Sequence, residues 1–297
     1  MTLTPRPVLV WLLRIVWVAL PVVAGPAVSA SLQHWSDAPR LLAEVMLWAA
    51  WGVALLAMFA PRPIGLTAVR AVAPAFAAFA IAVAWTGKPS TAASVAAIVA
   101  TLCAAVLASG HDIAIASVNA GAYGDEQRMP LRVPPALFLA PLPAARAGLV
   151  VGVATGPLLL ADGRLVVGVV ALVVGVPLVV VLARALNGLS RRFAVLVPAG
   201  FVVVDPMTLQ DPILLLRERI ASMQAAPPAI APDGVLDLRL GATSGSIAIR
   251  FDQAAEVTTA GRARRPAETV RTDELWVAVV RRTEVLHAAA GRRIRVG

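Results

Sequence analysis

Apolar residues fill most of the first 184 positions of the chain, in long runs separated by short polar or proline-containing breaks. A run of about 20 apolar residues is long enough to cross the hydrocarbon core of a bilayer as a helix. The pattern therefore predicts an all-α transmembrane domain over residues 1–184, with six spans near residues 8–30, 41–60, 67–85, 91–109, 147–161 and 165–183.

Two of these spans have alternative interpretations. The first ends in AVSA at 27–30, which resembles the small-residue cleavage site of a secretory signal peptide. We favour an uncleaved span, because apolar residues on both sides of Arg14 lengthen the run. The fifth span is short and carries small residues four apart, a spacing that allows close approach of a second helix. We predict packing within the chain rather than a homodimer face for Gly148, Gly152 and Gly156.

A polar connector interrupts the apolar runs at 110–146. Long segments between structural elements often hold binding residues. We therefore predict that this connector binds a partner through Asp112, Asn119, Tyr123, Asp125, Glu126, Arg128 and Arg132. For the two adjacent carboxylates at 125–126, an ion pair with a nearby arginine is favoured over catalysis. Asp112 is also interpreted as part of a helix end.

The periodicity changes in the tail, residues 191–297, where apolar and polar residues alternate as in half-buried strands. A hairpin is expected from the runs at 193–197 and 201–204, and a second from 236–240 and 247–251. Further strands are expected at 212–216 and 275–280, and a helix from an N-cap at Thr283 to Gly291. This order predicts a small mainly-β domain like a PH-like barrel capped by a C-terminal helix. A split β-sandwich with a docked helix is the alternative.

Charged residues of the tail suggest two further surfaces. Asp205 and Asp211 precede prolines beside strands, and we add them to the predicted partner-binding residues. Exposed basic residues near an anionic membrane surface contribute roughly 1 kcal/mol each. We predict such lipid-facing contacts, some of them in a loop at 258–272, for Arg262, Arg264, Arg265, Arg292 and Arg293. A solvated face is the alternative.

Composition supports the membrane class: 59% of residues are hydrophobic and only 14% are charged. The net charge of +9 does not indicate nucleic-acid binding, because arginines cluster at the ends of the apolar runs. With both termini in the cytoplasm, the positive-inside rule is satisfied. The predicted outer face then carries only Arg40, Lys88 and Arg164, and the inner face carries Arg6, Arg62, Arg70, Arg128, Arg132, Arg146, Arg184, Arg191 and Arg192.

Few chemical motifs stand out. Cys103 is the single cysteine, and the three histidines lack metal-ligand spacing, so we expect neither a disulfide nor a metal site. The glycines near 121–124 lack the Lys-Ser/Thr of a phosphate-binding loop. Ser244 lacks the spacing of a nucleophile elbow. We therefore expect no cofactor and no enzymatic activity.

Two stretches carry a resemblance. The sequence YGDEQRMPLR at 123–132, and VPAGFVVVDP at 197–206 continuing through QDPIL at 210–214, are similar to segments of uncharacterised multi-pass membrane proteins of high-GC bacteria. The resemblance implies a helical membrane domain followed by a PH-like cytoplasmic domain. It implies no chemistry.

The resulting hypothesis is a non-enzymatic scaffold or docking protein of the cytoplasmic membrane. Its connector and tail would bind a cytosolic or membrane protein partner or lipid, and a homo-oligomer is compatible with the glycine spacing. The alternative is a small-solute transporter or channel component that uses the bundle interior, and a lipid-modifying membrane enzyme ranks third.

Overall fold

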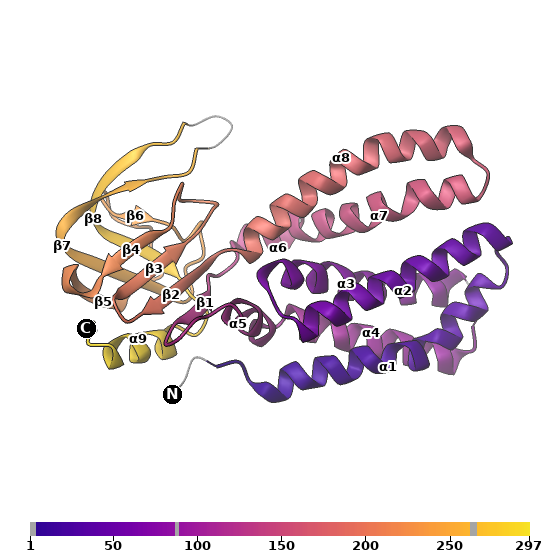
Figure 1. The fold of residues 1–297 in the computed structure, drawn as a ribbon, viewed down its shortest axis with the longest axis horizontal. Helices are drawn as coiled ribbons and strands as arrows, with labels where there is room; N and C mark the ends of the chain where they lie inside the picture. Colours follow the sequence, from indigo (N-terminus) through magenta and orange to yellow (C-terminus); the bar gives the residue numbers. More distant parts are fainter. Residues whose placement is uncertain (1–3, 87–88, 262–265) are drawn as a thin grey trace. The chain divides into compact units, whose positions relative to one another are not determined.

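The computed structural model describes residues 4–86, 89–261 and 266–297. The chain forms two compact units (Figure 1). The helical unit consists of residues 6–113 and 142–187. Among the described residues, the β-rich unit consists of residues 114–141 and 188–297, together with Thr4 and Pro5.

Among the described residues, six helices are long and apolar enough to cross a membrane, which confirms the prediction of six apolar helices. The chain thus has the architecture of a multi-pass membrane protein. Helix α1 continues past the AVSA sequence. The fifth apolar helix begins at Pro141 rather than near residue 147, so it is about a turn and a half longer at this end than predicted. The six are α1 Pro7–Leu32, α2 Asp37–Phe59, α3 Pro63–Thr86, α4 Thr91–Ser109, α7 Pro141–Ala161 and α8 Leu165–Ser190.

Small side chains mediate the packing of α1 against α3 and α4, as in one core cluster of Ala24, Ala27, Ala80, Val83 and Ala97. Two arginines donate hydrogen bonds at helix ends, where the last carbonyl groups have no partner within the helix. Arg14 donates to the main-chain oxygen of Met58 at 2.8 Å, and Arg70 donates to the last carbonyls of α4. Arg14 also lies over the Trp11 ring, 4.7 Å from its centroid.

Helices α7 and α8 form an antiparallel hairpin (Figure 1). Glycines make the contact between the two helices. Added Cβ atoms at Gly148, Gly152 and Gly156 would lie only 2.6–2.9 Å from side chains of α8. Gly175 of α8 faces the main chain of Gly152, where its own Cβ would lie 2.9 Å from the carbonyl oxygen. All three glycines of the predicted packing stripe thus face a helix of the same chain.

The described part of the β-rich unit contains two four-stranded sheets and helix α9 Arg282–Gly291. Both sheets and α9 contribute to one core, which includes Phe201, Met223, Ile249 and Val285. The first sheet has the order β1-β2-β3-β4, with β1 Gln127–Pro130, β2 Phe193–Val197, β3 Gly200–Val204 and β4 Ile213–Leu216. The second has the order β5-β7-β8-β6, with β5 Ile220–Ala225, β6 Leu236–Asp237, β7 Ser246–Thr258 and β8 Thr269–Ala278.

The predicted hairpin at 193–204 is confirmed as β2 and β3. Glycine is required at its turn, because a Cβ atom on Gly200 would collide with the main-chain oxygen of Leu215. The predicted hairpin between 236–240 and 247–251 is wrong. Strand β6 instead pairs in parallel with β8, and the chain turns away after it, with a positive φ at Leu240 and Gly241.

Three other expectations for the tail need correction. Strand β5 was not predicted and pairs with β7. The predicted loop at 258–272 is shorter, since β7 reaches Thr258 and β8 begins at Thr269. Helix α9 begins at Arg282, so Thr283 lies inside the helix rather than at its N-cap.

The connector is structured. It contains helix α5 His111–Asn119, strand β1 and the short helix α6 Pro135–Leu139. Strand β1 pairs antiparallel with β2, from Gln127 opposite Leu196 to Pro130 opposite Phe193. The prediction placed residues 110–146 in the membrane domain, whereas residues 114–141 pack with the β-rich unit, because β1 fills the edge of its first sheet.

Candidate functional site

A polar pocket of about 500 Å³ lies in the β-rich unit, where the connector, the turn between β2 and β3, and the end of α9 meet. We call it the connector pocket. Both predicted groups of site residues contribute to it: Asp125 and Glu126 from the partner-binding group, and Arg292 and Arg293 from the lipid-facing group. The remaining lining residues are Gly124, Gln127, Pro198, Arg217 and Gly291.

Asn119 ties α5 to the strand that enters the pocket. Its side-chain oxygen accepts a hydrogen bond from the main-chain N–H of Arg128 at 2.9 Å, and its side-chain nitrogen donates to the Arg128 carbonyl at 2.6 Å. The same nitrogen donates to Ile115 within α5 at 3.1 Å. A single amide thus holds the main chain of β1 on both its donor and its acceptor side.

The side chain of Arg128 orders the loop before β1. Its guanidinium forms an ion pair with Glu126 at 3.0 Å and lies 5.7 Å from the ring centroid of Phe193. The hydrogen bond from Arg128 holds the pKa of the Glu126 carboxyl below its ordinary value. Glu126 also accepts from the main-chain N–H of Tyr123 at 3.4 Å. The predicted local ion pair is therefore present, between Glu126 and Arg128.

The other side of the pocket is cationic. Arg292 donates through Nη2 to the main-chain oxygen of Asp125, whereas its Nη1 is buried without a hydrogen-bond partner among the described residues. The Oε1 atom of Gln127 is likewise buried without a hydrogen-bond partner among the described residues. Arg217 and Arg293 are exposed. Among the residues that the structure describes, three arginines line the pocket against two carboxylates, and the Glu126 carboxylate is already paired with Arg128.

The other predicted partner-binding residues lie elsewhere. Asp112 is buried, and its Oδ1 accepts from the main-chain N–H of Arg6 at 2.7 Å. Tyr123 is 87% exposed, and Asp211 is also exposed. Arg132 is half-buried, with its main chain bonded to Ala278. The predicted lipid-facing residues Arg262, Arg264 and Arg265 lie outside the described residues.

Asp205 is a structural residue rather than a surface one. It forms a doubly hydrogen-bonded ion pair with Arg192 at 2.8 and 2.9 Å, in which the exposed fractions are 0% and 2%. Arg192 also donates to the main-chain oxygens of Arg132 and Leu238. The pair was accessible to sequence reasoning: Phe193 lies opposite Val204 in the hairpin, which brings the flanking Arg192 and Asp205 together.

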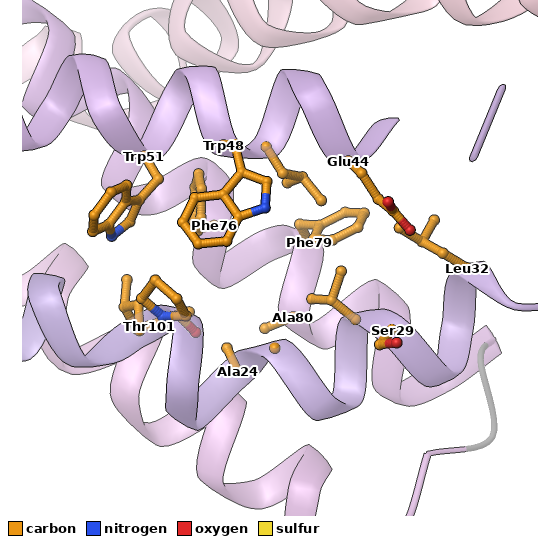
Figure 2. Close-up of a pocket in the computed structure, with 15 residues that line it drawn as sticks. Ala24, Ser29, Leu32, Glu44, Trp48, Trp51, Phe76, Phe79, Ala80 and Thr101 are labelled. Carbon is orange, nitrogen blue, oxygen red and sulfur yellow. The ribbon is translucent and has the colours of Figure 1, made fainter. Parts of the chain in front are cut away.

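A second pocket, of about 350 Å³, lies among helices α1 to α4 of the helical unit, and we call it the bundle cavity (Figure 2). Its walls include four aromatic rings, those of Trp48, Trp51, Phe76 and Phe79. Figure 2 shows Glu44 at one end of the cavity. The four rings come from two helices, α2 and α3, and the sequence of a single helix does not show which faces meet around a cavity.

Among the described residues, no three His, Cys, Asp or Glu side chains gather closely enough to hold a metal ion. Comparison with protein-family models, curated proteins and solved structures finds no match.

Proposed function

We propose that this chain is a docking protein of the cytoplasmic membrane, whose β-rich unit lies in the cytoplasm and binds an acidic segment of a protein partner in the connector pocket. The same proposal includes a PH-like fold for the β-rich unit. The excess of basic residues in the loops assigned to the inner face supports the cytoplasmic placement.

The observation that carries the proposal is the composition of the connector pocket. Its arginines outnumber its carboxylates, and Arg292 retains a buried donor without a partner among the described residues. Guanidinium groups bind carboxylates with two parallel hydrogen bonds, which gives both affinity and geometry. An acidic peptide segment is therefore the partner that best fits this pocket.

The fixed walls of the connector pocket also support binding. Asn119 holds the strand, Arg128 orders the preceding loop, and Arg217 is placed beside the β2–β3 turn by a hydrogen bond from its main-chain N–H to Ala199 at 2.9 Å. A preorganised site loses less conformational entropy on binding than a mobile one.

The test uses the full chain in lipid nanodiscs and a fluorescent glutamate-rich peptide. The double variant Arg217→Glu/Arg293→Glu reverses two pocket charges and is expected to weaken peptide binding about tenfold or more. The control is Arg219→Glu, since Arg219 is exposed in the same short helical turn as Arg217 but does not line the pocket. Its affinity is expected to stay near that of the wild type.

Equal affinities of the wild type and the double variant would overturn the proposal. Binding to vesicles of anionic lipid in place of the peptide would assign the pocket to a lipid headgroup instead. In native membranes, the protein partner should co-purify with the Arg219→Glu control but not with the double variant.

A further inference from the structure

The bundle cavity is independent of the connector pocket and has its own chemistry. Four aromatic rings from α2 and α3 line it, and Trp48 and Trp51 meet edge to face with centroids 5.4 Å apart. Its volume of about 350 Å³ falls in the range of small-molecule sites, which begins near 300 Å³.

Three hydrogen-bond donors in and beside the aromatic part are already bonded within the protein. The Trp51 indole N–H donates to the main-chain oxygen of Trp17 at 2.9 Å, and Trp17 donates to Trp51 in return at 3.0 Å. The hydroxyl of Thr101 donates to Ala97 at 2.7 Å. The body of a ligand in this part of the cavity is therefore held by apolar and aromatic contact rather than by these donors.

The opposite end is polar and acidic. Figure 2 shows Glu44 and Ser29 near Leu32, the last residue of α1, and Trp51 and Thr101 at the far end. Glu44 lies in the second turn of α2, one turn after Arg40. Its carboxylate pairs with Arg40 at 3.0 Å, but the two side chains are 40% and 39% exposed. An exposed ion pair contributes little to stability. A cation that enters the cavity therefore competes with Arg40 for the Glu44 carboxylate.

We propose that the bundle cavity binds a lipophilic organic cation, with an ammonium head beside Glu44 and an apolar body among the four rings. Aromatic faces attract a cation as well as apolar groups, and quaternary ammonium ligands are recognised by such rings in other sites. An anionic head would be repelled by the Glu44 carboxylate. A carboxylate and aromatic walls in one cavity thus select a positive charge on an apolar body.

The test uses the full chain in nanodiscs and two matched probes: 4-phenylbutyl-trimethylammonium, and its neutral analogue with a tert-butyl group in place of the trimethylammonium. Titration calorimetry and tryptophan fluorescence measure binding. The cation is expected to bind at least tenfold more tightly than the neutral analogue to the wild type. Glu44→Gln is expected to remove that preference while leaving the neutral analogue unchanged.

The matched control is Asp37→Asn, which removes a carboxylate from the first turn of the same helix without touching the cavity lining. It is expected to keep the preference for the cation. Trp48→Leu, which removes one ring, is expected to weaken both probes. Equal binding of the cation to the wild type and Glu44→Gln, or no preference for the cation in the wild type, would overturn the proposal.

Discussion

The helical unit and the β-rich unit bury different mixtures of side chains: alanines are frequent in the core of the helical unit, although Leu13 and Trp17 are also fully buried there. Small residues such as Ala24, Ala27 and Gly152 make close contacts between the helices, while large apolar side chains such as Val166, at 79% exposed, point outward. The β-rich unit instead encloses large side chains such as Phe201 and Ile249. Lipid is as apolar as a leucine side chain, so helices in a bilayer gain from close packing rather than from hiding apolar surface.

The two units also use arginine differently. In the helical unit, Arg14 and Arg70 donate to carbonyl groups at helix ends, where a helix has no partners of its own. In the β-rich unit, Arg192 is buried at the centre of a network with Asp205 and two main-chain oxygens. The comparison indicates that the buried pair of Arg192 and Asp205 stabilises the β-rich unit, whereas close contacts of small residues stabilise the helical unit.

The largest expected effect is in the β-rich unit. Asp205→Ala leaves the Arg192 charge buried without its carboxylate, and the free energy of unfolding of this unit is expected to fall by about 3–5 kcal/mol. Hydrogen exchange of the β-strand amides, in the full chain in detergent, measures the loss. Asp211→Ala is the control, because Asp211 also precedes a proline but is exposed. Similar losses in both variants would show that the pair is not what stabilises the unit.

The second prediction tests the fit of small residues in the helical unit. A Cβ atom in Gly175→Ala would lie 2.9 Å from the main-chain oxygen of Gly152, so the α7–α8 hairpin must separate. The expected cost is about 1–3 kcal/mol, measured as a lower thermal unfolding temperature in detergent. Gly188→Ala in the same helix is the control, since its added Cβ meets no atom within 4 Å. An unchanged temperature for Gly175→Ala would contradict close glycine packing.

A third prediction concerns the join between the connector and the first sheet. Asn119→Ala removes the hydrogen bonds to both main-chain groups of Arg128, at an expected cost of about 1–3 kcal/mol. Faster hydrogen exchange at the Arg128 amide is the specific readout. Gln210→Ala changes an exposed side chain and serves as the control. If the Arg128 amide stays protected without Asn119, the pairing of β1 with β2 is sufficient by itself.

The smallest expected effect depends on pH. Because the Arg128 hydrogen bond lowers the pKa of Glu126, the contact is fully formed above the ordinary pKa of 4.5 and is lost as the pH falls through the lowered value. The amide signal of Tyr123, which donates to Glu126, should therefore shift only in acid. Glu126→Gln should abolish that shift. A transition near neutral pH would assign the signal to another group.

The sequence predicted four of the residues that line the connector pocket, but it did not predict that they lie together. Asp125 and Glu126 were predicted from the connector, and Arg292 and Arg293 from the tail, as separate surfaces. They line one pocket because β1 joins the first sheet, a pairing between segments more than 60 residues apart. Alternation of apolar and polar residues predicts a strand without naming its partner. The same limit explains the wrong hairpin at 236–251.

The sequence by itself determined the six apolar helices, the β2–β3 hairpin and the C-terminal helix, because helix length, local turn chemistry and side-chain periodicity depend on neighbouring residues. Only the tertiary structure decided that residues 114–141 pack with the tail, that Asp205 is buried against Arg192, and that four aromatic rings surround a cavity beside Glu44. These features arise from contacts between distant segments, whose geometry is set by packing and long-range strand pairing rather than by local preference.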